Sequence, residues 1–189
     1  MNLIPTVIEK NDDEKIAYDL FSRLLVDRII ILNGEINNHT ASLIIGQLLF
    51  LDNQEKSDIT LYINSPGGSV TDGLAIYDTM QHIKSPVSTI CVGIAASMAA
   101  IILAAGENGK RYILKNSEVM IHEPLGGVQG KASDMKINTD RILKIREKLN
   151  KILAKHTKKT VKKVSKDTLE DYYMEANEAL EYGLVDKIV

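Results

Sequence analysis

The residue best placed to do chemistry in this chain is Ser97. It lies between an apolar, β-branched run at residues 86–93 (PVSTICVG) and an alanine-rich run at residues 98–105 (MAAIILAA). The first pattern predicts a strand buried on both faces, and the second predicts a helix. A serine at such a junction lies beside unpaired backbone amides, so its hydroxyl could attack a carbonyl while the following amide faces the oxyanion. The same position suits a serine that only caps the helix, and this stretch taken alone favours capping.

Three other segments have composition that could serve a binding site. Gly67 and Gly68 lie between a predicted strand and a predicted helix, where paired glycines let the backbone approach a ligand closely, although a tight turn explains them equally well. Residues 106–110 (GENGK) are too short for a phosphate-binding G-x-x-x-x-G-K-[ST] loop, so no ATP site is predicted. Residues 151–166 hold seven lysines and no acid, but without interleaved aromatic residues they indicate a solvated helix end rather than a nucleic-acid surface.

The elements that must position these residues alternate between strands and helices. Strands are predicted at residues 29–32, 58–63, 86–93, 110–114 and 117–122 and at the C-terminal end. Helices are predicted at residues 14–28, 40–51, 69–84, 97–105, 132–155, 160–166 and 176–182, with residues 1–13 as an arm or loop and an acidic loop after residue 166. This alternation predicts an α/β fold with mainly parallel strand pairing. No linker or change in composition divides the chain, so we expect a single domain over residues 1–189.

Composition limits the classes of function. A net charge of -2 gives no global attraction to nucleic acid or to a membrane. The single cysteine, Cys91, excludes an internal disulfide and fits a reducing compartment. Residues 85–106 carry no charge, but Pro86 and Gly93 interrupt them, so they indicate core rather than a membrane span. With no secretory signal visible, a cytoplasmic location is expected.

Three motifs follow one another along the chain: SPGGS at residues 65–69, AASMA at residues 95–99 and MIHEP at residues 120–124. In this order they resemble the ClpP family, the proteolytic subunits of the ATP-dependent caseinolytic (Clp) serine proteases. The likeness runs from residues 1–9 (MNLIPTVIE) to residues 178–186 (EALEYGLVD), essentially the whole chain. It implies a crotonase-like spiral of repeated β-β-α/β-α units, with a projecting handle helix.

The resemblance also implies a serine endopeptidase site. It assigns the nucleophile to Ser97, the general base to His122, the orienting acid to Asp171, and the oxyanion hole to the backbone N–H groups of Gly68 and Met98. These roles suit the residue types, because an imidazole can pass the hydroxyl proton to the leaving amine and a carboxylate can fix its tautomer. Each residue has an ordinary alternative: a polar residue at a strand end for His122, and a solvated loop acid for Asp171. The rival histidines are His39, His82 and His156, and the rival acids are Asp167 and Glu170.

The same resemblance implies that the protein forms a large assembly. Two stacked heptameric rings would enclose the sites in a chamber, with a handle region at about residues 126–156 between the rings and residues 1–13 lining the axial pore. An AAA+ unfoldase such as ClpX, ClpA or ClpC would hydrolyse ATP, deliver unfolded proteins and dock in apolar pockets, for which Tyr62 and His82 are candidate positions. The chain itself would need no cofactor and no metal, and no nucleic acid or membrane partner is expected.

The chain departs from the family pattern in two segments, residues 122–124 (HEP) and residues 167–171 (DTLED). Glu123 follows His122 where the family usually has glutamine, and Glu170 replaces an arginine that pairs across the contact between rings. Reversing that charge predicts a weaker or differently built double ring, either a homo-oligomer or a hetero-oligomer with a ClpP paralogue. Two alternative functions are a weakly active or regulatory ring subunit that needs such a paralogue, and a crotonase-type acyl-CoA enzyme, whose fold also offers paired amides to an oxyanion.

Overall fold

A mostly parallel sheet carries the fold in residues 4–11 and 14–189, the part of the chain that the computed structural model describes. Its strands are β3 (Ile29–Asn33), β4 (Ile59–Ser65), β5 (Val87–Ala96), β6 (Arg111–Ile113), β7 (Glu118–Ile121), β8 (Tyr172–Glu175) and β9 (Lys187–Ile188). The order along the sheet is β3-β4-β5-β6-β9, and β7 pairs with β5 and β8. Every pair is parallel except β7–β8, so the predicted α/β class with mainly parallel pairing is confirmed.

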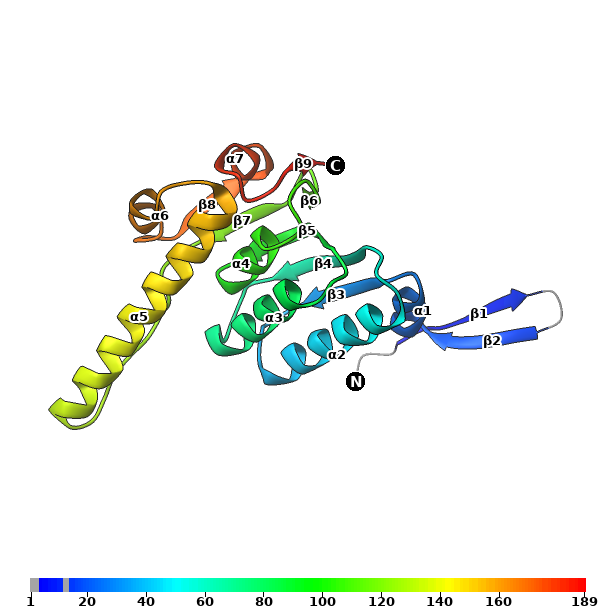
Figure 1. Cartoon of the computed structure of the whole chain (residues 1–189), viewed down its shortest axis with the longest axis horizontal. Coiled ribbons are helices and arrows are strands. Elements are labelled where there is room, and N and C mark those ends of the chain that lie inside the picture. The colour runs from blue at the N-terminus through cyan, green and yellow to red at the C-terminus, as the bar shows by residue number, and fades with distance from the viewer. Residues whose placement is uncertain (1–3, 12–13) are drawn as a thin grey trace.

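Helices cover the sheet and extend beyond it. They are α1 (Leu20–Val26), α2 (Asn38–Gln54), α3 (Val70–His82), α4 (Met98–Ala104), α5 (Ala132–Thr157), α6 (Val161–Asp167) and α7 (Ala176–Tyr182). Figure 1 shows α2, α3 and α4 side by side over the sheet, whereas the amino-terminal part of α5 projects away from it, as the sequence predicts for the handle helix. None of the described helices combines the length and apolar composition needed to cross a bilayer.

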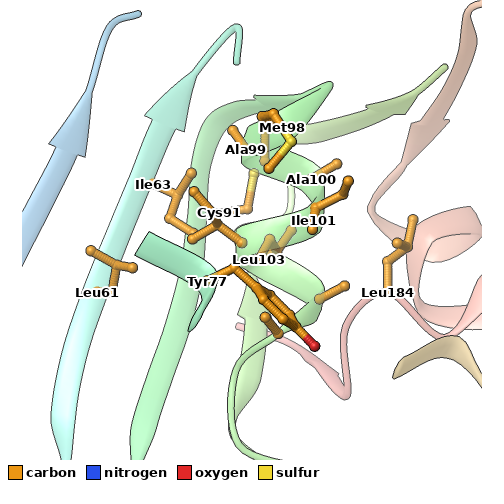
Figure 2. Packing of buried hydrophobic residues seen from close by; sticks show 14 of the residues in the cluster. Leu61, Ile63, Tyr77, Cys91, Met98, Ala99, Ala100, Ile101, Leu103 and Leu184 are labelled. Atoms are coloured by element: carbon orange, nitrogen blue, oxygen red, sulfur yellow. The ribbon is translucent and has the colours of Figure 1, made fainter. Parts of the chain in front are cut away.

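The helix α4 is buried in the core, where it packs on β5. All seven residues of α4 are buried, and their alanines allow a close approach to the sheet. Figure 2 shows Met98 and Ala99 of this helix near Ile63 and Cys91 of the strands beneath it. Burial raises the pKa of the Cys91 thiol to about 12, so this cysteine behaves as a small apolar residue. The rigid pair of β5 and α4 therefore holds the corner between them, which is Ser97.

The prediction of one helix over residues 14–28 is wrong in its first part. Residues 14–19 form β2 (Glu14–Asp19), which pairs antiparallel with β1 (Thr6–Asn11) in a separate hairpin, and the helix begins only at Leu20. Asp19 caps that helix by accepting a hydrogen bond from the Ser22 amide at 3.0 Å. The pairing between β1 and β2 is a contact that helical periodicity does not reveal. Residues 1–3 and 12–13 of the predicted arm lie outside the described residues.

The acidic loop predicted after residue 166 is only partly a loop. Its last residues form β8, which runs antiparallel to β7. The sequence of β8 (YYME) is too short for a clear alternating pattern, so its strand conformation follows from its pairing with β7. This pairing fixes the position of Asp171, which directly precedes β8.

An ion pair between buried Arg111 and partly buried Asp186 ties the C-terminal segment to β6. The Arg111 Nε donates to Asp186 Oδ2 at 2.8 Å, and Nη1 donates to the carbonyls of His156 and Gly183 at 3.0 Å each. Burial opposes ionisation of Asp186, but the hydrogen bonds from Arg111 outweigh it and hold the pKa of this carboxyl below its ordinary value. The folded state therefore favours the ionised carboxylate.

We expect Asp186→Ala to lower the free energy of unfolding by about 3 kcal/mol at pH 7, because Arg111 stays buried without its carboxylate. The pKa of Asp186 is lower in the folded state, so the contribution of the ion pair is present above about pH 4 and is lost as the pH falls further. Urea unfolding at pH 7 and at pH 3.5 measures both effects. The control is Asp58→Ala, which removes an exposed ion pair with Lys110 and should cost less than about 1 kcal/mol. Equal losses for the two variants at pH 7 would contradict the expectation.

Candidate active site

Three parallel strands, β4, β5 and β7, end at one edge of the sheet. The segments that follow them carry Gly67 and Gly68, Ser97, and His122 respectively. Ligand sites in parallel sheets form at this carboxyl edge. The Ser97 amide donates to the Met120 carbonyl at 2.9 Å, which fixes the end of β5 against β7. Strand pairing thus brings the three predicted segments together.

Ser97 occupies a sharp, strained corner between β5 and α4. Its backbone has φ 57° and ψ −123°, a conformation that residues with a side chain seldom adopt. The Ser97 side chain makes no capping hydrogen bond to α4. Its Oγ lies instead 2.9 Å from His122 Nε2. The interpretation of Ser97 as only a helix cap is therefore wrong.

His122 lies between Ser97 and Asp171. Its Nδ1 is 2.9 Å from Asp171 Oδ1, on the opposite side of the ring from Ser97. With its proton on Nδ1, the imidazole donates to the carboxylate and its Nε2 accepts the hydroxyl proton of Ser97. The His122 side chain is largely buried, whereas that of Asp171 is 57% exposed.

The β7–β8 ladder explains why Asp171 is the partner. The last pair of that antiparallel ladder is Ile121 with Tyr172, so the next facing positions are His122 and Asp171. Consecutive residues on a strand point to opposite faces, which makes the choice of acid specific to this register. The rival Asp167 has other partners, because it accepts hydrogen bonds from Lys163 and from the Tyr182 hydroxyl.

The other histidines lie apart from Ser97. His156 Nε2 is 3.1 Å from the Tyr77 hydroxyl, and burial lowers the pKa of His156 to about 4, aided by Lys155 and Arg111. His39 is in the first turn of α2, and His82 is the last residue of α3. Among the four histidines, all in the described ranges, His122 is the one that the structure hydrogen-bonds to Ser97.

The predicted oxyanion donors flank the same corner. A Cβ placed on Gly67, whose φ is +89°, would lie 2.7 Å from Ser97 Cβ, so this loop packs directly against the serine. Gly68 is fixed by a parallel bridge to Ile36. Within residues 4–11 and 14–189, the amides of Gly68 and Met98 have no hydrogen-bond acceptor. Met98 begins α4, where an unpaired amide points out of the helix end, so both groups can donate to a ligand.

A cavity of about 390 Å³ opens beside the candidate site. It is lined by residues that follow Gly68 and His122 in the chain and by one face of α5: Val70, Pro124, Leu125, Gly127, Val128, Gln129, Asn138, Arg141, Ile142 and Ile145. A space of this size can receive a substrate side chain. The sequence analysis does not single out these residues, because they come from α3, the loop after β7 and α5 and meet only in the folded chain.

Two further predicted features fall elsewhere in the structure. Tyr62, in the middle of β4, is half-buried, and His82 is exposed at the end of α3; partner docking at these residues stays a prediction. No group of three or more His, Cys, Asp or Glu side chains suited to a metal ion occurs in the part of the chain that is described.

In a comparison with known protein families, the family model described as Clp protease matches residues 11–189 of the chain. The matched range contains all the segments that meet around Ser97. The family and the geometry of this corner therefore point to the same kind of chemistry.

We expect Gly67→Ala to lower kcat/KM for peptide hydrolysis by about 100-fold, because the added Cβ must displace the Ser97 corner. The control is Gly34→Ala, which places a Cβ at a similar φ of +79° but meets no atom within 4 Å. Both variants carry the strain of a side chain at positive φ, and Gly67→Ala adds a steric clash, so its thermal unfolding temperature should fall further than that of Gly34→Ala. Equal activities for the two variants would show that close packing at Gly67 does not shape the site.

Proposed function

Because the chain belongs to the Clp protease family, we propose that it is a serine endopeptidase that cleaves unfolded polypeptides and peptides. The observation that supports this most strongly is the chain of two hydrogen bonds, each 2.9 Å, from Ser97 through His122 to Asp171. A serine hydroxyl alone is a weak nucleophile, and an adjacent oriented base activates it.

In the proposed reaction, Ser97 Oγ attacks the carbonyl carbon of the scissile peptide bond while His122 Nε2 takes the hydroxyl proton. The carbonyl oxygen becomes negative and accepts hydrogen bonds from the amides of Gly68 and Met98. His122 then gives its proton to the leaving amine, and an acyl-enzyme remains. A water molecule, activated by the same imidazole, releases the acid product and restores the hydroxyl. The Asp171 carboxylate orients the ring and stabilises the imidazolium.

We further propose that the active sites lie in a compartment, because a cell tolerates an unselective peptidase only when few of its proteins can reach the active sites. We place the sites inside stacked heptameric rings in the cytoplasm, fed by an AAA+ unfoldase that consumes the ATP, so that the chain itself needs no cofactor. Two features support an assembly: α5 and the β1–β2 hairpin both project from the body (Figure 1). Large apolar side chains are also exposed on or near α1 and α2, including Phe21, Val26, Leu43, Leu49 and Phe50.

Glu170 bears on how the rings meet. Its side chain is exposed and directly precedes Asp171. An acid at a position where the resemblance expects a pairing arginine would repel its counterpart across the contact. This supports a weakened double ring or one completed by a ClpP paralogue, and it is the reason to keep a regulatory ring subunit as the second candidate. The acyl-CoA alternative has less support, because it does not use the contact between Ser97 and His122.

We expect Glu170→Arg to strengthen assembly of the double ring. In sedimentation at sub-micromolar concentration, the wild-type protein should dissociate into smaller species, and the variant should shift the distribution toward a tetradecamer. The control is Glu181→Arg, which makes the same charge change at an exposed position of α7. A wild-type homo-tetradecamer that is stable and active at that concentration would contradict this expectation.

We expect Ser97→Ala and His122→Ala each to lower kcat for a fluorogenic peptide by a factor of about 10³ or more, because each removes a group that reacts directly. Asp171→Asn should cost less, about 10- to 10³-fold, because its carboxylate is partly solvated and acts through the imidazole. Matched controls are Ser42→Ala and His39→Ala, which change the same residue types on α2. The proposed function fails if the assembled wild-type protein, alone and mixed with a typical paralogue, cleaves no faster than Ser97→Ala.

A further inference from the structure

An ion pair joins α5 to the residue that follows the candidate base. Arg146 Nη1 donates to Glu123 Oε2 at 3.1 Å, and the two side chains are 39% and 37% exposed. Glu123 directly follows His122, so this contact holds the backbone beside the imidazole. The arginine reaches it from a helix whose amino-terminal part projects from the body (Figure 1).

A second contact from the same helix reaches the same place. The Glu123 amide donates to the Thr168 carbonyl at 2.7 Å, and the Thr168 hydroxyl lies 3.2 Å from Asn150 Oδ1 and 3.0 Å from the Val164 carbonyl, the two acceptors within its reach. Thr168 and Asn150 are both buried. Arg146 and Asn150 are four residues apart and therefore share one face of α5. This face thus anchors both the segment that carries His122 and the segment that leads to Asp171.

His122 needs such an anchor because it lies just beyond the last pair of the β7–β8 ladder. Its ring contacts Ser97 on one side and Asp171 on the other, and Asp171 is itself largely exposed. Neither contact fixes the backbone. A displacement of about 1 Å at a reacting group can cost 100-fold in rate, so the position of this backbone matters for catalysis.

We propose that Arg146 is a positioning residue: by holding Glu123 it keeps the His122 imidazole in line with Ser97 Oγ. This inference rests on the proposed peptidase function and adds to it a connection from α5 to the base. Arg146 does not contact the substrate carbonyl or the reacting atoms. Because the pair is partly exposed, salt screens it, and raising the ionic strength lowers kcat in the wild-type protein.

The test compares Arg146→Met with Lys151→Met in the assembled full-length protein. Both remove a cation from α5 and break one ion pair, since Lys151 pairs with Glu147 at 2.6 Å. We expect Arg146→Met to lower kcat about 10-fold with KM changed less than about 2-fold, and to abolish the salt dependence of kcat. Lys151→Met should match the wild type. Arg146→Lys should recover most of the loss, because it restores a cation at the same position.

A double-mutant cycle with Glu123→Gln separates positioning from general destabilisation. If Arg146 acts through Glu123, kcat of the double variant equals that of Arg146→Met alone. The inference is overturned if the losses in kcat of the two single variants multiply in the double variant. It is also overturned if the loss of kcat in Arg146→Met accompanies a lower thermal unfolding temperature and Arg146→Lys does not recover it.

The experiments distinguish an error in the role of Arg146 from an error in the proposed function. If wild-type protein cleaves peptides and Arg146→Met cleaves them equally well, only the positioning role is wrong. If wild-type protein neither cleaves peptides nor reacts at Ser97 with a fluorophosphonate, the proposed function is wrong and the inference falls with it. A crystal structure of Arg146→Met gives a readout that is independent of turnover: we expect the Nε2–Oγ distance to exceed hydrogen-bond range, and an unchanged distance contradicts the proposal.

Discussion

The site depends on the pairing of β7 with two neighbours of opposite direction. The parallel pairing with β5 brings Ser97 beside the end of β7, and the antiparallel pairing with β8 places Asp171 opposite His122. A slip of one residue in the second ladder would turn Asp171 to the other face and leave the imidazole without its acid. The short register of β7–β8 therefore decides whether three residues from distant parts of the chain act together.

The corner at Ser97 depends on packing of a different kind. A left-handed backbone at a non-glycine residue costs about 1–3 kcal/mol and persists only where its surroundings impose it. Here the strain is held between β5 and the fully buried α4 (Figure 2), with the backbone of Gly67 pressed against the serine. Because the side chain does not cap the helix, its hydroxyl remains available to His122, and the helix amides remain available to an oxyanion. The residue with the strained backbone is thus also the residue with the available hydroxyl.

The sequence predicted those parts of the fold in which each element carries its own pattern. The strand, corner and helix around Ser97 are contiguous, and the long amphipathic α5 was placed to within two residues of its end. The β1–β2 hairpin and β8 were not predicted, because their conformation follows from pairing rather than from their own periodicity. The same limit applied to the site: patterns in the residues identified Ser97, but only the family resemblance separated His122 and Asp171 from their rivals. The ion pair between Glu123 and Arg146 joins residues 23 apart, and no local pattern indicates it.

The central claim is that a hydroxyl at a strained corner becomes reactive through an imidazole fixed by strand pairing. Treating the assembled protein with a fluorophosphonate, and locating the adduct by peptide mass spectrometry, tests this most directly. The account predicts a single adduct on Ser97, formed at least about 100-fold more slowly in a protein that lacks the His122 imidazole. No adduct on Ser97, or an adduct that forms at the same rate without His122, would contradict it.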